Sequence, residues 1–206
     1  MLQRAALLFF LAAATAGGKP AFAGKAEEGP FMPMLGEASS PVGYISFCTR
    51  HPFDCVARTR TPVLVTLDDD RWLDLLVVNR SVNSRVAPAT DQEVYGVEEY
   101  WEYPIDRGDC EDYVLLKRKE LIERGWPPST VLITVVRDEN GDGHAVLTVR
   151  TDHGDLVLDN KVEIIRPWFE TPYTYIKRQS VYDAMKWTRI DDRRSTASVA
   201  SIRRRP

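Results

Sequence analysis

The chain has few cysteines, no long hydrophobic run and no excess of positive charge. Three cysteines in 206 residues exclude a disulfide-dense scaffold. A net charge of −3 lacks the basic footprint of a nucleic-acid-binding protein, so no nucleic-acid partner is expected. The apolar run near the N-terminus is shorter than the roughly 20 residues that span a bilayer, so no membrane-spanning helix is expected. What is present, 44% hydrophobic residues, is enough for one ordinary core.

The N-terminus has the features of a secretory signal peptide over residues 1–23. Arg4 supplies the positive start, residues 5–14 form the apolar run, and Ala21-Phe22-Ala23 is a cleavage site of the A-x-A type. We therefore expect an exported, periplasmic protein in a compartment where disulfides persist.

The rest of the chain divides into three parts by composition. Residues 24–40 are polar and contain Gly, Pro and Ser, which predicts an irregular leader. Residues 191–206 are rich in arginine and lack an apolar period, which predicts a disordered basic tail. Residues 41–190 are predicted to form a single domain.

Within this domain, periodicity predicts helices first and strands later. Asp68-Asp69-Asp70 caps a helix over 72–82, in which Trp72, Leu75, Leu76 and Asn79 form the periodic face. Asp109 caps a helix over 110–124 that Gly125 ends. Strands are predicted at 130–136, 144–150 and 156–159, with turns at Asn140-Gly141 and His153-Gly154. This order predicts an α+β domain with helices packed on an antiparallel sheet; the type of segment 181–187 stays open.

The three cysteines divide into a pair and a single residue. Cys48 and Cys55 are close in sequence, and in an oxidising compartment they are expected to form a disulfide. A zinc site with His51 is the alternative, but a second pair of ligands at structural spacing is missing. Cys110 is then an unpaired thiol in an exported protein, which requires an explanation.

Cys110 lies at the predicted start of helix 110–124. On a helical wheel it shares an apolar stripe with Val114 and Leu121 and faces the sheet, whereas Asp112 points away. The helix dipole and the free N–H groups of a first turn favour a thiolate and an oxyanion. This setting suits a cysteine nucleophile.

The carboxylates around Cys110 oppose this role, because negative charge raises the pKa of a thiol. A histidinium or a bound cation has to offset them. Asp109, Glu111 and Asp112 offer hard oxygen ligands that suit Ca²⁺, so we expect a calcium site here. The alternative is that these acids only cap the helix.

His144 and Asp159 are the candidate base and its orienting carboxylate. His144 opens a buried-looking strand, and Asp159 ends the next apolar run, where a carboxylate is unusual unless paired. A strict His153-Gly154 turn would leave Asp159 opposite Thr148 and too far from His144. We therefore predict a looser turn, a four-residue loop over 150–153 or a bulge near residue 152.

These segments resemble the bacterial transglutaminase-like cysteine proteinases, of which the LapG-type periplasmic proteases are the best-known members. The similarity is carried by Thr90-Asp91, Tyr95-Gly96, Gly108-Asp109-Cys110-Glu111-Asp112-Tyr113, Gly143-His144-Ala145-Val146, Leu158-Asp159-Asn160 and the stretch from Thr171 to Ser180. It implies a papain/transglutaminase-like fold and a triad of Cys110, His144 and Asp159. It also implies calcium bound by acids flanking the nucleophile, which correspond to Asp109 and Glu111. Large biofilm adhesins as protein substrates and an inner-membrane regulatory receptor are further implications.

Two other functions remain open from the sequence. The same triad would serve acyl transfer to an amine, as in a transglutaminase or amidase, and the fold can also persist as a non-catalytic periplasmic binding module. The second oxyanion donor is not identified; Asn79 and Asn83 are candidates that can equally be exposed helix residues. A redox role for Cys110 is disfavoured because no CxxC partner is near.

Overall fold

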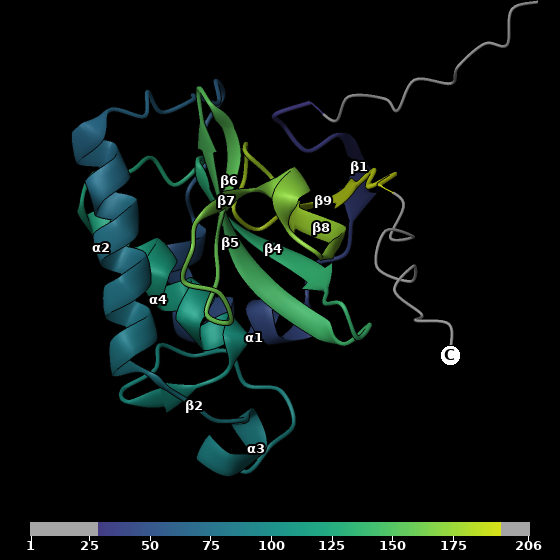
Figure 1. Ribbon diagram of the computed structural model, residues 1–206. Helices are drawn as coiled ribbons and strands as arrows, with labels where there is room; N and C mark the ends of the chain where they lie inside the picture. Colours follow the sequence, from purple (N-terminus) through teal and green to yellow (C-terminus); the bar gives the residue numbers. More distant parts are fainter. Residues whose placement is uncertain (1–28, 195–206) are drawn as a thin grey trace, which may run out of the picture.

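The chain folds as helices on one side of an antiparallel sheet, as predicted. The computed structural model describes residues 29–194 (Figure 1), so the expected signal peptide and residues 195–206 of the tail lie outside the described part. The helices are α1 (Val42–Arg50), α2 (Asp69–Arg85), α3 (Asp91–Val94) and α4 (Cys110–Glu123), with 3₁₀ turns at Pro52–Cys55 and Trp168–Glu170. No helix in this part of the chain has the length and apolar character to cross a membrane.

Seven strands form the main sheet, in the order β1-β9-β8-β4-β5-β6-β7. Every neighbouring pair is antiparallel. The strands are β1 (Met34–Ala38), β4 (Val131–Arg137), β5 (Gly143–Thr151), β6 (Gly154–Leu158), β7 (Arg166–Pro167), β8 (Thr174–Gln179) and β9 (Trp187–Ile190). A separate parallel pair, β2 (Ala87–Pro88) with β3 (Arg107–Gly108), lies beside α3 below the sheet in Figure 1.

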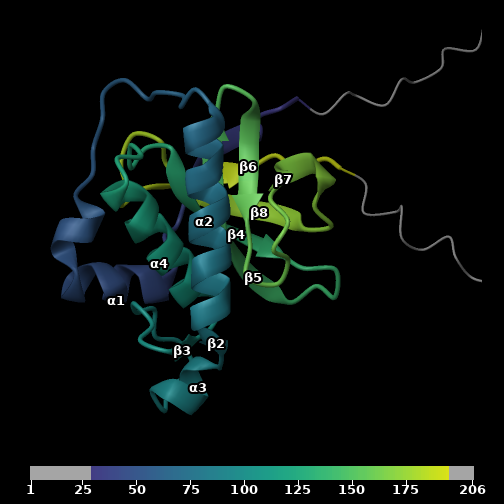
Figure 2. The same ribbon diagram turned by 60° about the vertical axis from the view of Figure 1, so that its left-hand side comes forward.

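Two apolar clusters pack on the sheet because alternate residues of its central strands point to opposite faces. Ala145, Leu147 and Val149 belong to the larger cluster, which also contains the buried faces of α1, α2 and α4. Val146 belongs to a smaller cluster with Trp168, Tyr173 and Tyr175. Figure 2 shows α2 and α4 side by side on the helical face. Helix α4 is thereby held against the central strand β5, and its first residue, Cys110, accepts a hydrogen bond from the Ala145 backbone of β5.

The expectation of an irregular leader over 24–40 is wrong for residues 34–38. These residues form β1, which pairs antiparallel with β9 at the sheet edge. The tail prediction is also wrong at its start, because the Arg194 guanidinium stacks on Trp168 and donates to the Thr171 carbonyl. Both segments are polar in sequence, and their order comes from partners far along the chain.

The helix predicted over 72–82 is longer, and its buried face is shifted. Asp68 is its N-cap and accepts a hydrogen bond from the Arg71 N–H at 2.8 Å, as the acidic start predicted. The buried residues are Leu75, Val78, Asn79 and Val82. Trp72 and Leu76 are instead partly exposed, at 37% and 41%, because the buried side of α2 follows the 75–78–82 stripe.

Candidate active site

Local sequence signals position Cys110 at the first residue of α4. Asp109 precedes the helix in extended conformation, although its side chain makes no capping hydrogen bond. Gly125 follows the helix with φ of +84°, a conformation that favours glycine. Cys110 is half-buried, keeps a free thiol and packs against the larger apolar cluster.

The thiol of Cys110 is held by its acidic neighbour. Its Sγ donates to Glu111 Oε2 at 2.9 Å. Burial raises the pKa of Cys110 well above its usual value, and the charge of Glu111 raises it further. A hydrogen bond from the Ala145 backbone N–H acts in the opposite direction. The thiol therefore lies beside Ala145, the residue that follows His144. Its raised pKa favours the protonated form, so a nearby positive charge is needed for it to ionise.

His144 and Asp159 are in contact, with His144 Nε2 2.9 Å from Asp159 Oδ1. Both side chains are buried. Tyr173 Oη donates to the other carboxylate oxygen, and its ring packs edge-on against the imidazole at 5.4 Å. Burial opposes ionisation of Asp159, but the hydrogen bonds from His144 and Tyr173 outweigh it and keep the pKa of Asp159 below its usual value. Because the contact uses Nε2, Nδ1 is left for proton exchange with a thiol.

The turn that brings this pair together differs from the prediction. β5 and β6 are joined tightly, with Thr151 opposite Gly154 and Leu147 opposite Leu158. The predicted four-residue loop and the bulge near residue 152 are therefore wrong. In the observed register Asp159, which follows β6, continues opposite Val146, and His144 is its diagonal neighbour on the same face. Diagonal neighbours across antiparallel strands are within reach of such side chains, so the contact forms without the looser turn.

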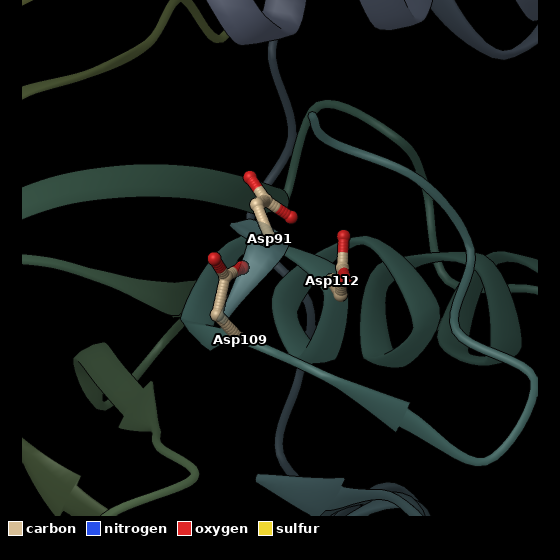
Figure 3. Close-up of side chains that lie close together, drawn as sticks. All are labelled: Asp91, Asp109 and Asp112. Atoms are coloured by element: carbon tan, nitrogen blue, oxygen red, sulfur yellow. The ribbon is translucent and has the colours of Figure 1, made fainter. Parts of the chain in front are cut away.

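Three aspartates, one of them next to Cys110 in sequence, converge at the start of α4 (Figure 3). Oxygens of Asp91, Asp109 and Asp112 lie within 4.8 Å of one another, a spacing compatible with one metal ion. They come from the start of α3, the residue before α4, and the first turn of α4. Backbone N–H groups hold two of them: Tyr100 donates to Asp91, and Glu102 donates to Asp112 Oδ1 at 2.8 Å.

One buried oxygen of each aspartate, Asp91 Oδ1, Asp109 Oδ1 and Asp112 Oδ2, makes no hydrogen bond with a described residue. Burial raises the pKa of all three, to about 7 for Asp109 and about 8 for Asp112, and neighbouring carboxylates add to it. Unpaired buried carboxylate oxygens are costly, and a hard cation would satisfy them. The donor set therefore fits Ca²⁺.

This cluster changes the predicted metal set in two respects. Asp112, predicted to point away from the protein, is fully buried because the 99–103 segment covers the first turn of α4. Glu111 does not join the three aspartates and binds the Cys110 thiol instead. Asp91 was not identified as a ligand from the sequence, although Thr90-Asp91 has the form of a helix start and Thr90 makes a capping box with Glu93.

The two asparagines considered as oxyanion donors have other partners. Asn83 Nδ2 donates to the Asp159 carbonyl and Asn79 Nδ2 to the Glu163 carbonyl, each at 2.8 Å. They tie the loop after β6 to α2 and so support the position of Asp159. On the other side of this loop Lys161 forms an ion pair with Asp138 at 2.7 Å.

The predicted disulfide is present between Cys48 and Cys55, so the alternative zinc site is excluded. The bond joins α1 to the 3₁₀ turn that follows it. His51, between the two cysteines, lies 2.6 Å from Glu102 through Nε2. This contact links the disulfide loop to the segment that covers Asp112.

Comparison with known proteins identifies a family. The family model for "Bacterial transglutaminase-like cysteine proteinase" matches residues 34–195. Among solved structures, calcium-bound LapG of Legionella pneumophila aligns at 24% identity and a TM-score of 0.46, over 52% of this chain and 64% of that one. EGTA-treated LapG gives 25% identity, the same TM-score, and 52% and 62% coverage. The chain thus spans less than two thirds of these LapG chains, and no curated protein matches it. Because the family model covers most of the sequence, including Cys110, His144 and Asp159, the chain belongs to the bacterial transglutaminase-like cysteine proteinases.

Proposed function

We propose that this protein is an exported thiol peptidase in which Cys110 is the nucleophile, His144 the general base and Asp159 the residue that orients it. The observation that carries the proposal is the buried contact between His144 Nε2 and Asp159 Oδ1 at 2.9 Å. The next residue after His144, Ala145, donates its backbone N–H to the Cys110 thiol. Nucleophile, base and orienting carboxylate are the three parts that thiol hydrolysis requires.

In the proposed reaction His144 takes the proton of Cys110, and the thiolate attacks the peptide carbonyl carbon. The backbone N–H groups at the start of α4 are positioned for the resulting oxyanion. His144 then gives the proton to the leaving amine, which leaves a thioester on Cys110. Water, deprotonated by His144, hydrolyses the thioester and restores the thiol. Tyr173 and the Lys161 N–H, which both donate to Asp159, keep its carboxylate ionised and in place.

We further propose that Asp91, Asp109 and Asp112 hold Ca²⁺. Their three unpaired buried oxygens support this assignment, together with the family resemblance around the nucleophile. A bound calcium ion supplies positive charge that offsets the carboxylates around the thiol. Glu111 acts differently in this proposal: it holds the thiol proton in the metal-free state and has to release it before attack.

The substrate and location are proposed from the resemblance and the N-terminal signal. We propose a periplasmic protein that cuts a large surface adhesin involved in biofilms and that an inner-membrane receptor regulates. An amine acceptor in place of water would make the same thioester a transamidation intermediate, so the assay has to separate the two outcomes.

The test is alkylation of the free thiol with iodoacetamide, followed by mass spectrometry, in calcium and in EGTA. We expect calcium to accelerate labelling of Cys110, and His144→Ala and Asp112→Asn to remove the acceleration. Glu123→Gln is the matched control, because Glu123 is an exposed acid on the same helix. Equal labelling rates with and without calcium would refute the calcium proposal.

Catalysis is tested with a purified adhesin fragment, with and without a labelled primary amine. Peptide products that disappear in Cys110→Ala support the peptidase, whereas incorporation of the amine without cleavage would replace it with acyl transfer. Retained binding of the fragment without any product in the native protein would favour a binding module.

A further inference from the structure

A second cavity lies away from the proposed active site. Its volume is about 460 Å³, and its walls come from the segments 57–63, 127–132 and 179–184, with Arg118 of α4 among them. Arg118 is eight residues after Cys110, or about 12 Å along the helix axis. In β4, Val136 pairs with His144, and Leu132 on the cavity wall lies four residues before Val136. Four residues of a strand span roughly 13 Å. The cavity is therefore separate from the triad.

Arg118 is the unusual group in this cavity. It is 5% exposed, and two of its nitrogens bind only carbonyl oxygens: Nε that of Val131 at 3.1 Å and Nη1 that of Asp54 at 3.5 Å. Asp54 acts on Arg118 electrostatically, but within residues 29–194 no carboxylate lies within salt-bridge distance of Arg118, and Nη2 makes no hydrogen bond. Arg178, the other deeply buried arginine, pairs with Asp155 at 2.8 Å. Because buried charges are normally paired, Arg118 has an open position for an anion.

The rest of the cavity wall suits a ligand that has one negative charge attached to an apolar group. Arg58, the other cation on the wall, is already paired with Asp183 at 3.1 Å. The Gln179 side chain is fully used, because it donates to Tyr44 Oη and accepts from the Ile133 N–H. Most other wall positions are apolar or small: Ala57, Val63, Pro127, Pro128, Leu132 and Val181.

The cavity is held open by main-chain bonds between its walls. The Thr59 N–H donates to the Tyr182 carbonyl at 2.9 Å, and the Ala184 N–H donates to the Ala57 carbonyl at 3.0 Å. The disulfide at Cys55 fixes the chain just before this wall. The wall carries three charged side chains, of which Arg58 and Asp183 pair with each other and Arg118 does not. A volume of this size with a partly apolar lining and few charged groups is typical of small-ligand sites.

We propose that this cavity binds a carboxylate that carries an apolar side chain, with the guanidinium of Arg118 as its anion-binding group. A guanidinium matches a carboxylate in shape and charge. The carboxylate can belong to a free organic acid or to the C-terminal residue of a peptide. The proposal does not depend on the triad, because no residue is shared between the two sites.

The test is calorimetric titration of the purified protein with N-acetylphenylalanine and with its amide, which differ only in the carboxylate. We expect saturable binding of the acid and at least about tenfold weaker binding of the amide, the effect of losing one charge-assisted pair. Arg118→Met should remove the preference for the acid. Arg58→Gln is the matched control and should retain the preference, because Arg58 is already paired.

Two further arms keep the proposal open to refutation. Val63→Trp fills the cavity from its half-exposed wall and keeps Arg118 in the chain, and it should abolish binding even if Arg118→Met does not fold. Tighter binding of acetyl-Gly-Gly-Phe than of 3-phenylpropionate would support a peptide C-terminus as the ligand, and the reverse order would support a free acid. Equal affinity for acid and amide, undiminished binding in Val63→Trp, or no binding of any probe at millimolar concentration would overturn the proposal.

Discussion

Lys117 offers a quantitative test of how burial affects charge in this fold. It lies on α4 seven residues after Cys110, on the same side of the helix. Its side chain is fully buried, and Nζ makes no hydrogen bond with a described residue. Burial lowers the pKa of Lys117 from 10.5 to about 7, with Asp159 acting in the opposite direction. The perturbation is Lys117→Met, which keeps the length of the side chain and removes the ammonium.

The magnitude follows from this pKa difference. In the unfolded chain the amine is protonated below pH 10.5, but in the folded protein protonation is penalised until the pH falls to about 7. The penalty on folding is therefore complete below pH 7 and shrinks as the pH rises toward 10.5. The difference of 10.5 − 7 = 3.5, at about 1.4 kcal/mol per pH unit, corresponds to on the order of 5 kcal/mol. Lys117→Met should raise the free energy of unfolding by about this amount at pH 6, and by much less at pH 10.

The assay is urea unfolding of both proteins at pH 6 and pH 10, with Lys119→Met as the control. Lys119 is exposed on the same helix, so its replacement changes the net charge equally without removing a buried ion. A gain in stability that is equal at the two pH values, or a loss at pH 6, would show that the ammonium of Lys117 is satisfied in the folded protein.

Four further predictions concern the site and its support. Asp112→Asn should raise the melting temperature in EGTA at pH 8, because burial of this carboxyl costs stability that grows as the pH rises from 3.8 to about 8 and is complete above it. It should also abolish the rise that calcium causes; an unchanged calcium effect would exclude Asp112 as a ligand. In the native protein the calcium-induced rise should grow between pH 6 and pH 8, as the acids lose their protons, and a flat profile would contradict the raised pKa values. Reduction of Cys48–Cys55 should lower the free energy of unfolding by about 2–3 kcal/mol, the entropy of a short closed loop, as measured by urea unfolding with and without reductant. Tyr173→Phe should lower kcat/KM about tenfold on a cleaved substrate through the lost hydrogen bond to Asp159, and full activity would remove Tyr173 from the site.

Predictions based on local signals agree with the structure. Asp109 and Gly125 delimit α4 because helix ends are determined by the residues at those ends. The hairpin at Asn140-Gly141 forms where expected, with Gly141 at φ of +88°. Strand β1 was missed because its residues have no apolar pattern, and it exists through pairing with β9, about 150 residues away.

The errors at the site have the same origin. A helical wheel describes α4 in isolation, so it left Asp112 exposed, whereas the 99–103 segment folds over it. Asp91 lies 18 residues before Asp109, and no local pattern connects the two. The turn prediction assumed that paired residues must be directly opposite, although the diagonal position also brings His144 to Asp159.

The sequence by itself determined the family and the disulfide pair, and it indicated Cys110 at a helix start as the candidate nucleophile, with His144 and Asp159 as its proposed partners. These depend on residue types, short spacings and local capping, which are properties of neighbours along the chain. Only the tertiary structure decided which acids converge as the candidate metal site, which register joins His144 to Asp159, and that Glu111 holds the thiol. It also left Lys117 and Arg118 as buried cations on adjacent positions of one helix. The physical reason is that burial and contact are set by segments distant in sequence, and these decide charge states.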